Sequence, residues 1–198
     1  MSGTPGRPLS AELSEQLVAV AVDILAEEGW GRLNSDRVAA RARAGKAGIY
    51  RRWPSMAALA RSAVSRFTLV HAPEDEGSVR ADLVALVGSW RRPLSREERA
   101  VASLVGAARH DEDLRAGLDA ALVHPLTESV EQLGRRWAGR GDDVPAERLA
   151  LLRSVLEAFW WQRLTAAGDG AMVAEHVEQV VDEVLMPIVA PVAEPARR

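Results

Sequence analysis

Basic side chains are concentrated in one stretch of this chain of 198 residues. From residue 32 to residue 66 there are nine arginines or lysines and a single acid, Asp36. The nine are Arg32, Arg37, Arg41, Arg43, Lys46, Arg51, Arg52, Arg61 and Arg66. Guanidinium and ammonium groups neutralise phosphates and hydrogen-bond to bases, so this density favours contact with a polyanion such as DNA. A solvated charged surface is the alternative interpretation.

No second set of residues has the spacing of a catalytic or metal site. The sequence contains no phosphate-binding glycine loop, no His-Glu-x-x-His pattern and no nucleophile elbow. Its four histidines share no ligand-like spacing, and the absence of cysteine excludes disulfides, thiolate metal sites and cysteine nucleophiles. We therefore expect no enzyme activity, no metal and no cofactor.

The charge of the chain divides into two parts. Residues 1–71 carry +4 and residues 72–198 carry −7, and the sign changes at a segment rich in proline, glycine and acids. The predicted organisation is a flexible arm at 1–9, a DNA-binding domain at 10–71, an effector-binding and dimerisation domain at 72–190, and a disordered tail at 191–198. No apolar run is long enough to span a membrane and the first residues lack a signal-peptide core, so we expect a cytoplasmic protein without a membrane partner.

Apolar residues recur at helical spacing and no useful strand-like alternation occurs, which predicts an all-α fold of about nine helices. In the first domain the expected helices start near Ser10, at Asn34 or Ser35, at Lys46 and after Ser55, and they end near residues 29, 41, 52 and 70. The second and third flank a tight turn around Arg43. Two short helices around such a turn are typical of a helix-turn-helix, whose second helix lies in the major groove.

The second domain is expected to contain five helices. They are predicted at 78–90, at 95–109 with a capping box formed by Ser95 and Glu98, at 111–137 with a kink at Pro125, at about 145–167, and in a last helix whose pattern ends at Pro187 and Pro191. The last two helices carry broad apolar stripes. Such stripes need cover, either from a partner copy or from the core of the same chain.

The string Lys-Ala-Gly-Ile-Tyr-Arg-Arg-Trp-Pro-Ser at residues 46–55 resembles the tetracycline-repressor (TetR) family, as do residues 23–30 and 33–35. The resemblance is strong over residues 10–70 and looser beyond them. It implies a dimer that binds a palindromic operator in double-stranded DNA, with a recognition helix at residues 45–51. The implied DNA-binding residues are Asn34, Ser35, Arg43, Gly45, Lys46, Ala47, Gly48, Tyr50, Arg51 and Arg52. Ile49 and Trp53 are expected in the core.

Three positions depart from the family pattern. Arg43 replaces a turn glycine, which implies left-handed strain or a different turn. Gly45 replaces a capping serine or threonine, and Met56 replaces a lysine. Because Gly48 also lowers helix propensity, the recognition helix depends on packing or on DNA for its order. The alternative function is a helical ligand-binding or interaction protein whose DNA-binding head is degenerate.

The resemblance also implies an effector pocket in the later helices and a four-helix bundle formed with a partner copy. Aromatic and polar residues that suit a pocket are Trp90, Arg109, His110, His124, Trp137, Phe159 and Trp160, although for each of them a core position is the more usual place. They favour an unidentified hydrophobic or aromatic effector that releases a repressor from its operator. The residues expected at the dimer interface are Leu152, Leu156, Phe159, Val173, Val177, Val180, Val181 and Val184.

Overall fold

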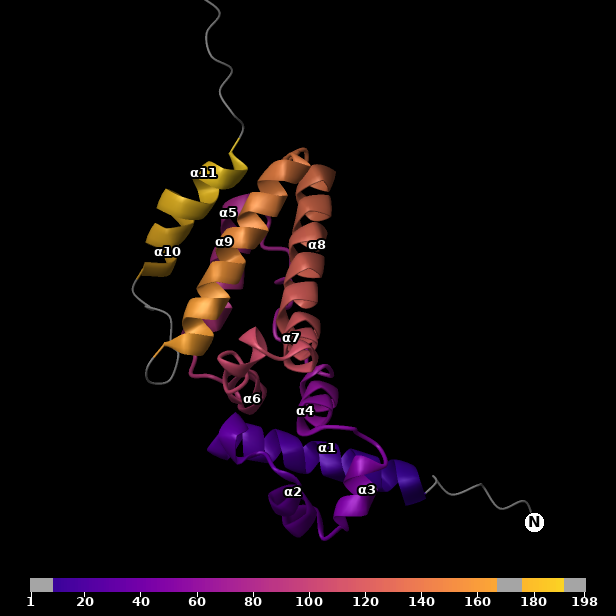
Figure 1. Cartoon of the computed structure of the whole chain (residues 1–198). Coiled ribbons are helices and arrows are strands. Elements are labelled where there is room, and N and C mark those ends of the chain that lie inside the picture. Colours follow the sequence, from indigo (N-terminus) through magenta and orange to yellow (C-terminus); the bar gives the residue numbers. More distant parts are fainter. Residues whose placement is uncertain (1–8, 167–175, 191–198) are drawn as a thin grey trace, which may run out of the picture. The chain divides into compact units, whose positions relative to one another are not determined.

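The computed structural model describes residues 9–166 and 176–190, with side chains from residue 11 onward. Every regular element in these ranges is helical, which confirms the all-α prediction (Figure 1). The chain forms two compact units. The first contains residues up to Thr68 together with Ser95–Leu122, and the second contains Leu69–Leu94 together with residues from Val123 onward. Residues 95–122, expected in the second domain, therefore pack within the first unit.

The first unit is built around one long helix. Its helices are α1 (Leu9–Glu28), α2 (Ser35–Ala42), α3 (Lys46–Tyr50), α4 (Met56–Val64), α6 (Arg96–Ala102) and α7 (Glu112–Leu118). Helix α1 packs against α2, α4 and α6, and α4 packs against α7. The core of this unit is apolar, and Leu17, Ile24, Val38 and Leu59 have no exposed surface. Helix α1 therefore supports the short helix α2 directly, and α2 in turn packs against α3.

Side-chain caps set the starts of three of these helices, as predicted. The Asn34 carboxamide oxygen accepts from the backbone N–H of Arg37 at 2.9 Å, which selects Asn34 over Ser35 as the cap of α2. Ser55 accepts from the N–H of Ala58 at 3.0 Å, and Ser95 forms the expected capping box. Two predicted lengths are wrong: α4 ends at Val64 rather than near residue 70, and α6 is followed by a separate 3-10 turn rather than reaching Arg109.

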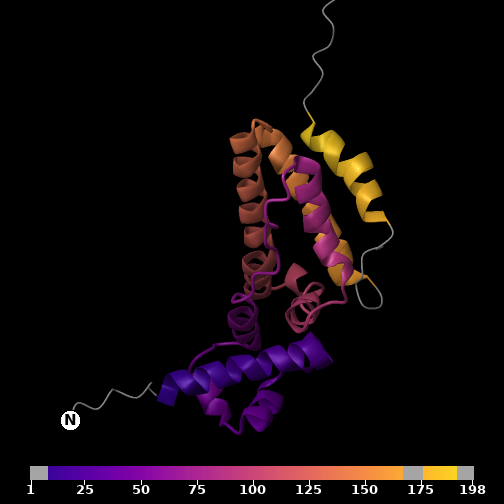
Figure 2. The same cartoon turned by 180° about the vertical axis from the view of Figure 1, so that it is seen from behind.

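The second unit places α5 (Val79–Gly88) with α8 (His124–Arg140), α9 (Ala146–Thr165), α10 (Val177–Val180) and α11 (Met186–Val189). Helix α9 packs against α8 and α11, and the final helical segment runs beside α9 in both views (Figures 1 and 2). The Arg80 guanidinium of α5 donates to both carboxylate oxygens of Asp182 at 2.6 and 2.8 Å. This pair ties α5 to the C-terminal segment.

Two π-helical turns accommodate prolines that were expected to interrupt helices. A π turn at Val181–Leu185 joins α10 to α11, and Pro187 lies in the first turn of α11. The prediction that Pro187 ends this helix is wrong, because the wider π turn avoids the clash between a proline ring and the carbonyl four residues earlier. A second π turn, Asp119–Val123, separates α7 from α8 ahead of Pro125, so the single helix expected at 111–137 is divided.

Candidate nucleic-acid interface

The turn between α2 and α3 depends on an unusual backbone conformation at Arg43. Its φ of 50° and ψ of 41° lie in the left-handed region, and in the described part of the chain no other non-glycine residue has a positive φ. The backbone N–H groups of Arg43 and Ala44 donate to the carbonyls of Ala40 and Ala39 at 3.3 and 3.0 Å, which closes the end of α2. Arg43 therefore adopts the conformation of the glycine it replaces, at a cost of about 1 kcal/mol.

Helix α3 turns one face to solvent and one to the core. Ile49 is fully buried, while Lys46, Ala47, Tyr50 and Arg51 are exposed, Tyr50 by 52%. Because an α-helix repeats every 3.6 residues, these four side chains share one exposed face. This face has the length and the residue types that suit a DNA groove.

The remaining residues predicted at the DNA have other surroundings. Asn34 is exposed and its side chain caps α2, and Ser35 is half-buried at the start of that helix. Gly45 is exposed and begins α3 without a side-chain cap. Gly48 and Arg52 are half-buried on the side of α3 that faces α1, so the structure does not bring them to the exposed face.

Most of the nine cations are held by partners within the same unit. The ion pairs are Arg37 with Glu28, Arg41 with Glu27 and Glu28, Lys46 with Asp36, Arg61 with Asp113, and Arg66 with Glu15. In the part of the chain that the structure describes, the side chains of Arg32, Arg43 and Arg51 are exposed and have no hydrogen bond or ion pair. These three arginines can reach phosphate without breaking an existing pair. Arg32 belongs to the same basic stretch but is not among the residues predicted at the DNA.

The residues predicted for an effector pocket are divided between the two units. Arg109 and His110 belong to the first unit and are exposed. In the second unit His124 is exposed and Phe159 is half-buried, whereas Trp137 is fully buried and donates its indole N–H to Asp82 at 2.8 Å. The structure thus gives these five residues different surroundings, and Trp137 is part of the core.

Trp90 and Trp160 are the two predicted pocket residues that touch. Their rings lie 5.3 Å apart between centroids in the core of the second unit. The buried indole N–H of Trp160 has no hydrogen-bond partner among the described residues. Trp90 also lines a hollow of about 290 Å³ with residues of the segment after α4 and of α5. The other lining residues are Leu69, His71, Ala72, Pro73, Ala85, Leu86, Ser89 and Arg92.

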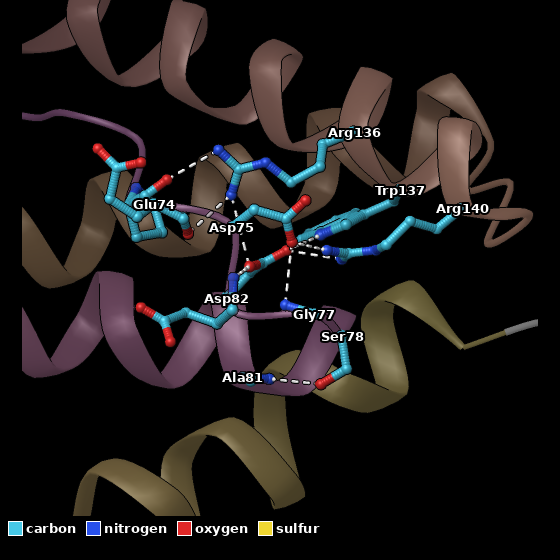
Figure 3. Close-up of polar contacts among 11 residues, drawn as sticks. Glu74, Asp75, Gly77, Ser78, Ala81, Asp82, Arg136, Trp137 and Arg140 are labelled. Atoms are coloured by element: carbon cyan, nitrogen blue, oxygen red, sulfur yellow. Dashed lines mark hydrogen bonds and ion pairs between the residues drawn. The ribbon is translucent and has the colours of Figure 1, made fainter.

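The segment rich in proline, glycine and acids, at which the charge changes sign, is anchored by a buried carboxylate, Asp82 of α5. This carboxylate has no exposed surface and accepts from the backbone N–H of Glu76 at 2.9 Å, the indole N–H of Trp137 at 2.8 Å and Arg140 at 2.7 Å (Figure 3). Arg136 lies 3.4 Å from the same carboxylate and donates to the carbonyl oxygen of Pro73 at 2.8 Å. We call Asp82, Arg136, Trp137 and Arg140 the Asp82 clamp.

The clamp keeps its carboxylate ionised. Burial alone would raise the pKa of Asp82, but the hydrogen bonds from Glu76, Arg140 and Trp137 outweigh burial and hold that pKa below its usual value. Sequence patterns did not reveal this cluster, because Asp82 lies more than fifty residues before the three α8 residues that contact it.

The residues predicted at a dimer interface differ in how deeply they are buried. Four of them are buried in the core of the protomer: Leu152, Leu156 and Val181 have no exposed surface, and Val177 is 6% exposed. Phe159 and Val180 are half-buried, and Val184 is 40% exposed. Val173 lies outside the described residues. Leu151 of α9 was not predicted, yet it is an exposed apolar side chain, 47% accessible.

In the described residues no group of histidine, cysteine, aspartate or glutamate could hold a metal ion, and no helix is long and apolar enough to cross a membrane. The fold and the basic, outward-facing α3 define the class: a helical protein with a helix-turn-helix. Two family models match, "Bacterial regulatory proteins, tetR family" over residues 17–63 and "Tetracyclin repressor-like, C-terminal domain" over residues 73–184. The chain therefore belongs to the TetR family, which confirms the resemblance, and it is a DNA-binding transcription regulator rather than an enzyme.

Individual relatives agree with this assignment. The chain is 34% identical over 184 residues to the DNA-binding transcriptional repressor TetR of Mycobacteroides abscessus, covering 90% of this chain and 94% of that protein. The crystal structure of the TetR family transcription regulator SCO0332 superposes with a TM-score of 0.57 at 26% identity, covering 87% of this chain and 98% of that one. Salmonella enterica GusR shares the fold, with a TM-score of 0.67 at 15% identity over 94% and 99% of the two chains.

Proposed function

We propose that this regulator is a homodimeric repressor that binds a palindromic operator through α2, the Arg43 turn and α3, and that a small effector releases it. The observation that supports DNA contact at this place is the exposed face of α3 with Lys46, Tyr50 and Arg51. Arg43 extends this face at the turn, and neither Arg43 nor Arg51 has a hydrogen-bond or ion-pair partner among the described residues. Repression is supported by the relative from Mycobacteroides abscessus, which is named as a repressor. The cytoplasm, where bacterial DNA lies, is the proposed location.

Dimerisation is supported by apolar surface on the two C-terminal helical segments. Leu151 and Val184 are exposed, and Phe159 and Val180 keep part of their surface. Large aliphatic side chains that gather on one surface indicate an interface. A twofold dimer would bury these residues against their own copies and present two α3 helices to successive major grooves of a palindrome.

An effector site is supported by the hollow beside Trp90. Its volume of about 290 Å³ and its mainly apolar lining suit a small hydrophobic or aromatic molecule. One wall of the hollow is the segment that continues from α4, which includes Leu69 and Ala72. Release of DNA requires that the effector binds more tightly to the arrangement that does not fit the operator.

The test is selection of bound sequences from random duplex DNA with the purified protein, followed by titration of the enriched sequence at two salt concentrations. We expect a palindrome whose affinity falls steeply as salt rises, because phosphate contacts release counterions. Replacing Lys46 and Arg51 together by alanine should weaken binding without changing the dimer. Arg135→Ala is the matched control, since Arg135 is an exposed arginine of the second unit paired only loosely with Glu131, at 3.8 Å.

Failure to enrich any sequence would contradict the proposal. It would favour the alternative of a helical ligand-binding or interaction protein with a degenerate head. Unchanged affinity in the Lys46 and Arg51 double variant, with binding intact in wild type, would contradict the placement of the interface on α3.

A further inference from the structure

Arg52 follows α3 directly, and its side chain is directed differently from that of its neighbour Arg51. Arg51 is exposed, whereas Arg52 is half-buried and its guanidinium bridges two helices. The Nε of Arg52 donates to the hydroxyl of Ser14 on α1 at 2.8 Å, and one terminal nitrogen donates to the carbonyl of Gly48 at 2.8 Å. We infer that Arg52 is a positioning residue that fixes α3 on α1, and that it is not a contact to DNA phosphate.

The recognition helix needs such a support because little within α3 stabilises it. It spans five residues, starts at Gly45 without a side-chain cap and contains Gly48. Glycine disfavours the helix, and the last carbonyls of any helix have no partner inside it. A guanidinium beside these carbonyls satisfies one of them and interacts favourably with the negative end of the helix. Arg52 therefore provides a side-chain hydrogen bond at the end of α3, whereas Gly45 provides none at its start.

Helix α1, which carries Ser14, is itself held in place by packing. It has twenty residues and packs against three other helices of the first unit. Residue 48 lies next to this helix, since a Cβ there would be at ordinary van der Waals distance, 3.8 Å, from both the Arg52 guanidinium and Leu13 of α1. The planar fork of arginine reaches both acceptors at once, which a lysine ammonium on a flexible stem cannot reproduce.

The inference rests on the proposed function, and the salt dependence of operator binding distinguishes the two roles. Each phosphate contact that is lost lowers the slope of log affinity against log salt by about 0.9. Arg51→Gln, which removes the exposed neighbour, should therefore lower the slope by about 2 for a dimer with two heads. Arg52→Gln should weaken binding by about tenfold and leave the slope unchanged, because the loss lies in the placement of α3.

Ser14→Ala is the decisive companion, since it removes the acceptor on α1 without altering any charge. We expect it to weaken operator binding several-fold at unchanged slope, and Arg52→Lys to behave like Arg52→Gln although it keeps the charge. A lower slope in Arg52→Gln overturns the inference, as does full affinity in both Ser14→Ala and Arg52→Lys. Circular dichroism of each variant checks that the helical fold persists.

Hydrogen exchange gives a readout that does not need DNA, so failure of the proposed function remains distinguishable. Amide protons of Tyr50 and Arg52 should exchange faster in Arg52→Gln and in Ser14→Ala than in wild type. In Arg51→Gln they should exchange at the wild-type rate. Equal exchange in all four proteins would overturn the positioning role even if no operator were found.

Discussion

Replacing Asp82 by asparagine should destabilise the second unit substantially. Both oxygens of this buried carboxylate accept hydrogen bonds, from Glu76 and Arg136 on one side and from Trp137 and Arg140 on the other. Every surrounding group is a donor. An asparagine NH2 group would therefore face donors in either orientation, and two arginines would lose their negative partner.

The expected loss is about 3 kcal/mol in the free energy of unfolding. Removing one partner of a buried ion pair costs about 3–5 kcal/mol, and asparagine keeps one acceptor oxygen, which places it at the lower end. For a chain of this size each kcal/mol lowers the melting temperature by about 2–4 °C, so a fall of about 6–12 °C is expected. Thermal and urea unfolding followed by circular dichroism measure both quantities.

Arg135→Ala on α8, the helix that carries Arg136 and Arg140 of the clamp, is the matched control. Its guanidinium is exposed and lies 3.8 Å from Glu131, and such surface pairs contribute about 0–1 kcal/mol. If Asp82→Asn melts within about 2 °C of Arg135→Ala, the clamp does not stabilise the protein and the reasoning is refuted.

The pH dependence gives a second check on the Asp82 clamp. The pKa of Asp82 is lowered in the folded protein by its hydrogen bonds, which outweigh the opposing effect of burial. Its contribution is therefore fully present above the unfolded pKa of about 4 and is lost as the pH falls through the folded value. The difference in stability between wild type and Asp82→Asn should be constant near neutral pH and should shrink below about pH 4.

Three further substitutions test other parts of the structure. Arg43→Gly should stabilise the fold by up to about 1 kcal/mol in urea unfolding, because glycine relieves the left-handed backbone, and it should also lower the salt slope of operator binding by about 0.9 per head. If Arg43→Gly kept the wild-type stability and the wild-type salt slope, both the backbone strain at Arg43 and its phosphate contact would be contradicted. Val184→Glu should shift the protein from dimer towards monomer in analytical ultracentrifugation, since a carboxylate would enter the proposed apolar interface, and an unchanged sedimentation coefficient would argue against that interface. Gly117→Ala should cost about 1–3 kcal/mol, because the new Cβ would lie 2.8 Å from Val64 and 3.3 Å from the backbone of Arg61, and an unchanged urea midpoint would mean that the two helices separate freely.

Local chemistry was sufficient for several conclusions drawn from the sequence. Asn34 and Ser55 cap helices where they were expected to, because a cap depends only on residues within one turn. The all-α class, the helix-turn-helix and the TetR family likewise follow from patterns within about ten residues. Even the left-handed Arg43 was anticipated as one of two outcomes, since the turn requires that conformation whichever residue occupies it.

Tertiary structure alone decided which charged side chains are exposed for contact with DNA and which are paired within the protein. Arg51 and Arg52 are identical neighbours in sequence, yet one is exposed and the other bonds to Ser14, which lies 38 residues away. The Asp82 clamp anchors the segment between the two predicted domains through residues 54 to 58 positions apart. Periodicity and capping rules act over one or two helical turns, whereas ion pairing and burial depend on which distant side chains the packed core brings within a few ångströms.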